Sequence, residues 1–239
     1  AGINVTLILL NMVPTQPEPG NPLIHPKTDL ANAPNHLGAF NLTDEEGLLH
    51  YRAAVEFLAD RYSQPSGEHG WVSGYIIGNE LQAHWWWHNM GHVSYEDLVT
   101  EYANQLRVAY TAIRRYHGKV RVYCSMDHHF AAGFVPDKGK CIPGDELLER
   151  LNTVISAEGN FPWHVAFHPY PENLFEPRFW NDKTAVLGFD TPRITFKNIE
   201  VLPAFLSQER FLYRDQPRRI ILSEQGLHCP DGPEGEQVQ

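Results

Sequence analysis

Five short apolar runs, separated by segments with helical spacing, limit the fold of this chain more than any other feature. The first run, "INVTLILL" at residues 3–10, is continuously apolar, which predicts a strand buried on both faces beneath covering helices. Further strands are expected at residues 71–78, 120–125, 163–167 and 219–223, and helices at residues 43–62, 94–118, 147–155 and 199–211. The alternation predicts an α/β fold with a parallel sheet, either open and doubly wound or a (β/α)8 barrel.

Two of the expected helices carry start signals. Thr43 with Glu46 three residues later forms the pattern of a capping box. Ser94, followed by Asp97, opens the second helix, and Gly118 ends it. The helix expected at residues 199–211 contains Pro203, which opposes an uninterrupted helix.

The chain reads as one domain over residues 1–229, followed by a disordered tail over residues 230–239, "PDGPEGEQVQ". No glycine-rich phosphate loop follows any strand, which argues against the nucleotide-binding version of the fold. The three cysteines are too few and too scattered for a disulfide framework. We expect Cys124 in the core and unpaired thiols at Cys141 and Cys229, although a bridge between the last two stays an alternative.

The charge balance excludes two classes of partner. The formal net charge is -10 and no run of lysine or arginine occurs, so neither nucleic acid nor an anionic membrane surface has an obvious binding region. The longest apolar run is also too short to span a bilayer. We therefore expect no nucleic-acid partner and no membrane partner.

A polar residue follows every predicted strand. In a parallel sheet the carboxyl ends of the strands meet at one rim, and functional groups gather there. The residues at these ends are Asn11, Asn79-Glu80, Asp127-His128-His129, His168-Pro169-Tyr170 and Glu224-Gln225.

Glu80 and Glu224 are the two strand-end glutamates. A facing pair of carboxyl groups is what glycosidic bond cleavage requires, one to protonate the leaving oxygen and one to attack the sugar carbon or activate water. Burial and the negative charge of the partner would raise the pKa of one glutamate, so that it starts the cycle protonated. One glutamate at a strand end would be read as an ordinary surface residue, but two after apolar strands favour catalysis.

The motifs "GYIIGNE", "HVAFHPYP" and "RRIILSEQG" resemble those of the clan A glycoside hydrolases, which are retaining barrel enzymes. The resemblance covers residues 71 to 226 in order and spacing. It implies that Glu80 is the general acid/base and Glu224 the nucleophile. It also implies that Asn79 binds the sugar hydroxyl next to the reacting carbon and that Tyr170 donates a hydrogen bond to Glu224.

The same resemblance sets the register of the strands. If Glu80 closes strand four and Glu224 closes strand seven, residues 3–10 form strand three and strands one, two and eight are missing. The chain is then an incomplete segment of a (β/α)8 TIM-type barrel, covering about strands three to seven, with open edges. An arginine from the early strands and a tryptophan from strand eight, both expected in the clan, cannot be located.

The stretch "HWWWHNMGH" follows the proposed acid. Aromatic rings stack on sugars, so Trp85 and Trp86 are candidate substrate contacts, and we expect at least one residue of the Trp85–Trp87 cluster to pack as core. His84, His88 and His92 are spaced by four, as in some metal sites on helices. The glycine and the tryptophans favour a loop instead, and we expect no metal.

Two further histidines complete the set of candidate residues. Of the pair His128-His129, one is expected to face the cleft and the other to be structural, and we assign His128 to the substrate. His168 is a third candidate substrate contact, with two alternatives: a satisfied core histidine, or a residue that orients Glu224.

The sequence therefore predicts a retaining glycoside hydrolase that acts on a poly- or oligosaccharide without a cofactor. Two alternatives stay open: a non-catalytic carbohydrate-binding barrel, and a metal-dependent hydrolase that would use His84, His88, His128 or His129. The sugar, its linkage and the oligomeric state are not predicted. A secreted or periplasmic location would follow only from the function.

Overall fold

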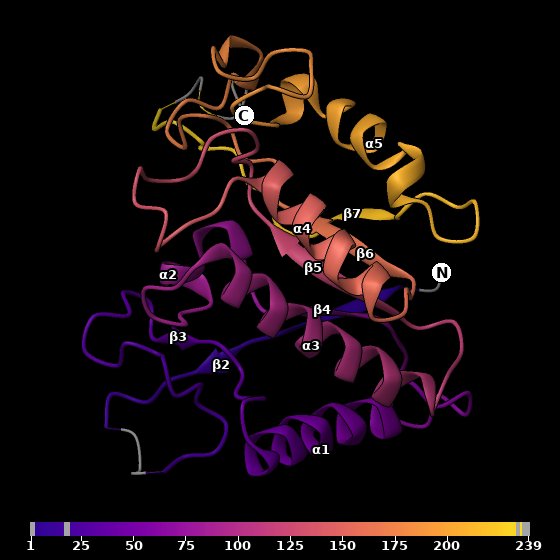
Figure 1. Cartoon of the computed structure of the whole chain (residues 1–239). Coiled ribbons are helices and arrows are strands. Elements are labelled where there is room, and N and C mark those ends of the chain that lie inside the picture. Colours follow the sequence, from indigo (N-terminus) through magenta and orange to yellow (C-terminus); the bar gives the residue numbers. More distant parts are fainter. Residues whose placement is uncertain (1–2, 17–19, 233–234, 236–239) are drawn as a thin grey trace.

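The computed structural model describes residues 3–16, 20–232 and 235. Its main sheet has five parallel strands in the order β1-β4-β5-β6-β7, so the order in the sheet is the order in the chain (Figure 1). The strands are β1 (Val5–Leu9), β4 (Val72–Ile77), β5 (Arg121–Met126), β6 (Trp163–Phe167) and β7 (Ile220–Leu222). In the described part of the chain, no helix is long and apolar enough to cross a membrane.

Helices connect the strands and lie along one face of the sheet (Figure 1). They are α1 (Glu45–Tyr62), α3 (Tyr95–Arg114), α4 (Gly144–Ala157) and α5 (Val201–Leu206). A doubly wound sheet would reverse its strand order and carry helices on both faces. Sequential order with one helical layer is instead the arrangement of a barrel wall, and the chain forms a half-barrel.

Shorter elements sit at the ends of the strands. They are β2 (Asn11–Met12), β3 (Leu37–Gly38), η1 (Leu81–Ala83), α2 (His84–Trp87), η2 (Phe179–Asn181), η3 (Phe196–Asn198) and η4 (Glu209–Phe211). The strands β2 and β3 pair antiparallel. Asn11 donates hydrogen bonds of 2.8 Å to the carbonyls of Leu23 and Ala39, so this strand-end residue holds the long loop after β1.

The main core fills the space between the helices and the convex face of the sheet. It includes Leu106 and Leu148 from the helices and Cys124 and Val165 from the strands, all without solvent exposure. The Tyr102 hydroxyl ties helix to sheet by donating to the carbonyl of Ile77 at 2.6 Å. A second, smaller cluster of Ile76, Tyr123, Ala166 and Ile221 lies outside this core.

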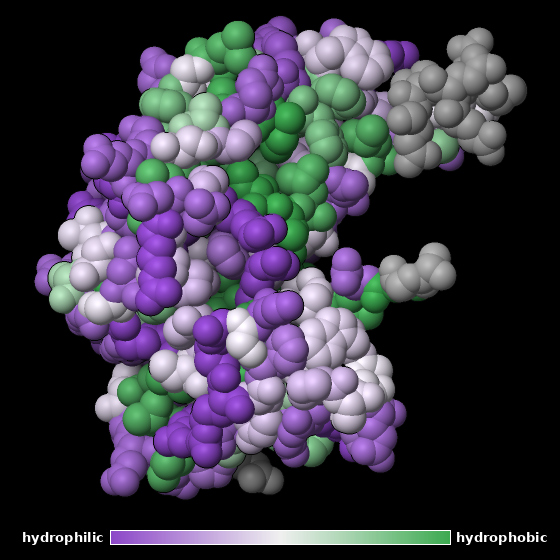
Figure 2. All heavy atoms as spheres, turned by 90° about the vertical axis from the view of Figure 1, so that its right-hand side faces the viewer, coloured by the Kyte–Doolittle hydropathy of each residue, from purple (hydrophilic) through white to green (hydrophobic). Residues whose placement is uncertain are grey.

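The strand β1 departs from the prediction. We expected burial on both faces, but Val5 and Ile8 are 41% and 38% exposed. The cause is position: β1 is an edge strand, and among the described residues it pairs only with β4. In Figure 2 the molecule is hollowed on one side, and apolar side chains are gathered along the hollow.

Two helical predictions also need correction. The first residue of helix α1 follows Asp44, whose carboxylate accepts from the Gly47 amide at 2.7 Å, while the Thr43 hydroxyl donates to Asn41. The predicted capping box at Thr43 is therefore wrong, because Asp44, one residue later, is the N-cap residue. The helix expected at residues 199–211 is split into α5 and η4, because the backbone at Gln208 is extended.

Other predictions agree with the structure. The Ser94 hydroxyl caps α3 by accepting from the Asp97 amide at 3.1 Å. All three cysteines are free, and Cys124 is buried in the core. Of the tail predicted to be disordered, residues 233–234 and 236–239 lie outside the described residues.

Candidate active site

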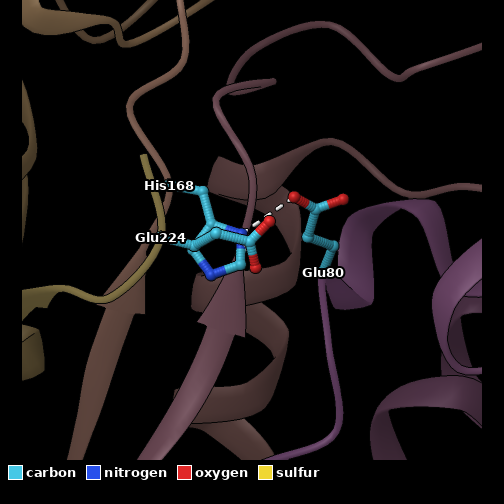
Figure 3. Close-up of side chains that lie close together, drawn as sticks. All are labelled: Glu80, His168 and Glu224. Atoms are coloured by element: carbon cyan, nitrogen blue, oxygen red, sulfur yellow. Dashed lines mark hydrogen bonds and ion pairs between the residues drawn. The ribbon is translucent and has the colours of Figure 1, made fainter. Parts of the chain in front are cut away.

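Glu80, His168 and Glu224 come together at the carboxyl end of the sheet (Figure 3). Glu80 follows β4, His168 follows β6 and Glu224 follows β7, and a ligand atom of each lies within 4.8 Å of the others. His168 Nδ1 is 2.8 Å from Glu80 Oε1 and 3.8 Å from Glu224 Oε2. The three strand ends therefore build one cluster, in which His168 Nδ1 lies beside both carboxylates.

A tight turn delivers Glu80 from the end of β4. Gly78 has a φ of 72° and Glu80 a φ of 37°, so both lie in the left-handed region. That conformation is costly for a glutamate, and such strain collects at functional sites. Ser125 on β5 holds the turn: its hydroxyl oxygen accepts from the Glu80 amide at 3.0 Å, and its hydroxyl donates to Asn79 Oδ1 at 3.4 Å.

Gly78→Ala is expected to destabilise the protein by about 1–3 kcal/mol. A Cβ at this position would lie 2.7 Å from His88 Nδ1, and the positive φ would strain any side chain. Urea unfolding measures the loss. Gly118→Ala is the control, because a Cβ there meets nothing closer than 3.8 Å. Equal effects of the two variants would contradict the role of this turn.

Glu80 is the more buried carboxylate, with 12% of its side chain exposed. Burial raises its pKa, and the negative charges of Asp127 and Glu224 raise it further. The hydrogen bond with His168 acts in the opposite direction without reversing the shift. A carboxyl group whose pKa is raised keeps its proton to higher pH, which suits a general acid.

His168 fixes the orientation of Glu80. Its side chain is fully buried, and its Nε2 has no hydrogen-bond partner among the described residues. An unpaired buried N–H is rarer than an unpaired acceptor, so we assign the proton to Nδ1, which then donates to Glu80 Oε1. This bond leaves Glu80 Oε2 as the oxygen that can carry the acidic proton.

Glu224 has a different environment. Its side chain is 45% exposed, and the Tyr170 hydroxyl donates to its Oε1 at 3.2 Å, the contact that the family resemblance implies. Burial, together with the negative charge of Glu224, raises the pKa of Tyr170 to about 12. The phenol therefore stays protonated and remains a donor at neutral pH. The two glutamates thus differ in solvation and in partners.

A second group of polar residues lies behind this cluster. Gln82 donates from Nε2 to the carbonyls of Asp127 and His129 and accepts from the Asp127 amide, at 3.0 to 3.1 Å. The Asp127 carboxylate holds His129 through both its amide and its Nδ1. His129 is accordingly structural. Burial lowers the pKa of His128 to about 4, so its imidazole is neutral.

Neither Gln82 nor Ser125 was identified from the sequence. Ser125 is the penultimate residue of β5, where a polar side chain at a buried position was a usable signal. Gln82 gives no such signal, because its partners come from the loop after β5, on a different part of the chain.

The tryptophan cluster differs from the prediction in two ways. The segment is helical, since η1 and the single turn of α2 replace the expected loop. All three tryptophans are half-buried, so none packs as core. Trp85 lies beneath the Lys140 ammonium at 4.5 Å, and Trp86 meets the ring of Phe134 edge-on at 4.7 Å. These rings contact the loop after β5.

The histidines spaced by four do not gather. His84 and His88 are buried, and burial lowers their pKa values to about 4 and about 3, whereas His92 bonds Asp137 at the surface. Across residues 3–16, 20–232 and 235, the only trio spaced to hold a metal ion is Glu80, His168 and Glu224. One imidazole and two carboxylates are donors that zinc accepts, so the same cluster could hold a metal.

Comparison with known proteins finds one family and several distant structures, among them two glucosidases. A glucosidase from Croceicoccus marinus has a TM-score of 0.43 and 16% identity, over 76% of this chain and 31% of that one. A hyperthermophilic β-glucosidase from Pyrococcus furiosus has a TM-score of 0.43 and 16% identity, over 77% of this chain and 42% of that one. The chain therefore spans less than half the length of either enzyme.

No curated protein matches the chain. The sequence model of DUF5722, described as a family of unknown function, matches residues 1–239. Since this match covers the whole chain, the protein belongs to the DUF5722 family.

Proposed function

We propose that this protein is a retaining glycoside hydrolase with Glu80 as general acid/base and Glu224 as nucleophile. The observation that carries the proposal is the approach of the two carboxylates, which have oxygens within 4.8 Å of each other. Retaining enzymes hold their carboxyl groups about 5–5.5 Å apart, whereas inverting enzymes need roughly 6.5–9.5 Å to admit a water molecule. The short approach favours direct attack on the sugar.

The reaction proceeds in two displacements. In the first, a Glu224 oxygen attacks the anomeric carbon while Glu80 Oε2 transfers its proton to the departing oxygen, so a glycosyl–enzyme ester forms and the glycosidic bond breaks. In the second, the ionised Glu80 takes a proton from water, whose oxygen attacks the same carbon and releases Glu224. Glu80 ends the cycle protonated, as it began.

The neighbouring residues receive supporting roles. Asn79, buried beside Glu80, would bind the hydroxyl next to the reacting carbon, and Tyr170 orients Glu224. His128, Trp85 and Trp86 would contact more distant parts of a poly- or oligosaccharide. We also assign the five strands to positions three to seven of a (β/α)8 barrel, which the sequential strand order and the single helical layer support.

Tyr170→Phe is expected to lower kcat about tenfold to a hundredfold, because it removes a hydrogen bond to the carboxylate of the proposed nucleophile. Steady-state kinetics measure the change. Tyr116→Phe serves as the control, since Tyr116 precedes β5 and so lies toward the opposite end of the sheet. A Tyr170 variant with unchanged kcat would remove the phenol from the mechanism.

The proposal is tested by the stereochemistry of the product. The protein is incubated with a panel of aryl glycosides and oligosaccharides, and proton NMR follows the first anomer released. Release of the anomer that the substrate carried supports the double displacement. Hydrolysis with inversion would refute it. If no glycoside is hydrolysed while an oligosaccharide binds equally to the wild type and to Glu224→Gln, the protein is a binding module.

A metal-dependent hydrolase is the second candidate, favoured by the spacing of Glu80, His168 and Glu224. In that case the purified protein contains about one bound metal ion, and a chelator removes both the metal and the activity. A retaining glycosidase of the proposed kind keeps its full rate after chelation. Metal analysis beside the kinetic assay therefore separates the two mechanisms.

A further inference from the structure

The end of the sheet opposite the carboxylates carries a different kind of site. There, Arg121 at the start of β5, His164 near the start of β6 and Arg219 just before β7 line a cavity of about 630 Å³. These residues lie on, or directly before, three neighbouring strands, because β5 pairs with β6 and β6 with β7. We call this space the basic cavity.

The lining of the basic cavity is cationic. Among the described residues it includes six basic side chains and no aspartate or glutamate, and the six are Arg114, Lys119, Arg121, Arg214, Arg218 and Arg219. None of the six forms a salt bridge with any residue in the described ranges, whereas eight other lysines and arginines do. In a chain with a formal charge of -10, such a concentration of unpaired cations needs a reason.

Arg218 is the fixed member of the group. Only 3% of it is exposed, and its guanidinium donates to the carbonyls of Phe211 and Phe161 and to Asn160 Oδ1, at 2.7 to 2.9 Å. It also lies 4.6 Å from the ring of Trp163. A buried charge without a counter-ion is costly. Arg218 therefore gives the wall of the cavity a positive charge that no carboxylate in the described part of the chain neutralises.

His164 adds a directed donor. Its Nδ1 accepts from the Arg219 amide at 3.1 Å, so its proton resides on Nε2. Burial, followed by the charges of Arg121, Arg218 and Arg219, lowers the pKa of His164 to about 3. The imidazole is neutral at physiological pH and offers one N–H.

We propose that the basic cavity binds a small ligand that carries two or more phosphate groups. A single phosphate carries a charge of about −2, so it would leave most of the positive charge of the six cations around the cavity unbalanced. Guanidinium groups match phosphate oxygens in geometry, and five of the six cations are not committed to backbone carbonyls as Arg218 is. A cavity of this volume is within the range of small-molecule sites. The proposal does not depend on glycosidase activity.

Calorimetric titration of the full chain with pyrophosphate tests this site. We expect saturable binding that weakens as sodium chloride is raised, because the contacts are between charges. The double variant Arg121→Gln/Arg219→Gln is expected to weaken binding at least tenfold. Its matched control is Arg52→Gln/Arg150→Gln, which removes the same charge from two surface pairs and is expected to change the affinity less than threefold.

A second readout does not depend on the variants. In the wild type, pyrophosphate is expected to shift the NMR signals of the His164 ring and to raise its pKa, because an anion offsets the neighbouring arginines.

The double variant without ligand is expected to be at least as stable to heat as the wild type, since it lacks two unpaired charges. Absence of binding at millimolar pyrophosphate, or equal losses in the two double variants, would overturn the proposal.

Discussion

Glu224→Gln is expected to reduce glycoside turnover by at least about 10⁴-fold, the largest effect of any single substitution in this protein. The amide keeps the shape of the side chain and can still accept from the Tyr170 hydroxyl. It cannot attack the anomeric carbon, so no glycosyl–enzyme ester forms. Because 45% of the side chain is exposed, unfolding by urea should match that of the wild type.

The control for this variant is Glu68→Gln, which removes the same charge from an exposed position before the amino end of β4. It should retain full activity. The variants are compared by kcat/KM on the best substrate and by mass spectrometry of the trapped ester, which should appear in the control alone. A Glu224→Gln enzyme with more than about a tenth of the wild-type rate would disprove the assignment.

Glu80→Gln is expected to act selectively on substrates with poor leaving groups. Hydrolysis of an alkyl glycoside should fall about 10²–10⁴-fold, because the departing oxygen no longer receives a proton. An activated aryl leaving group needs little protonation, so formation of the ester from such a substrate should fall far less. A Gln side chain can still accept from His168 Nδ1 through its oxygen, which preserves the geometry. Equal losses on both substrates would refute the acid role.

The pH dependence of the wild type follows from the same residue. As the proposed general acid, Glu80 would have to be protonated, and burial raises its pKa, so the wild-type rate should persist to a higher pH than an ordinary carboxyl group allows. Above that pKa the proton is lost and the rate on alkyl glycosides falls. The Glu80→Gln variant should lack this alkaline decline, which a pH profile of kcat/KM measures.

The elements that the sequence identified well are those whose cause is local. Strands with largely apolar sequences, such as residues 163–167, are found where predicted because burial of both faces leaves a simple pattern. The exposed strand β1 has the same pattern, since the apolar run cannot reveal that it lies at an edge. The cap of α1 was misplaced by one residue because Thr43 and Asp44 are both good capping residues.

In the candidate site, too, the residues with a local cause could be identified from the sequence, and those placed by tertiary contacts could not. Glu80, Glu224 and Tyr170 could be named from the sequence because each follows an apolar strand, and parallel strands bring such positions together. The role of His168 stayed open, because its contact with Glu80 depends on how far β4 and β6 lie apart across β5. The hydrogen bonds of Gln82 and Ser125 likewise join residues far apart in the chain, so no spacing in the sequence predicts them.

Sequential strand order has a consequence for the way the protein is made. Each strand pairs with the strand that precedes it in the sheet and in the chain, so on the ribosome every new unit can dock on one already in place. Glu80 and His168 emerge with β4 and β6, but Glu224 emerges later, after β7. Nascent chains therefore expose β1, β4, β5 and β6 before the second carboxylate of the cluster has been made, so the Glu80–His168–Glu224 cluster is completed only after β7.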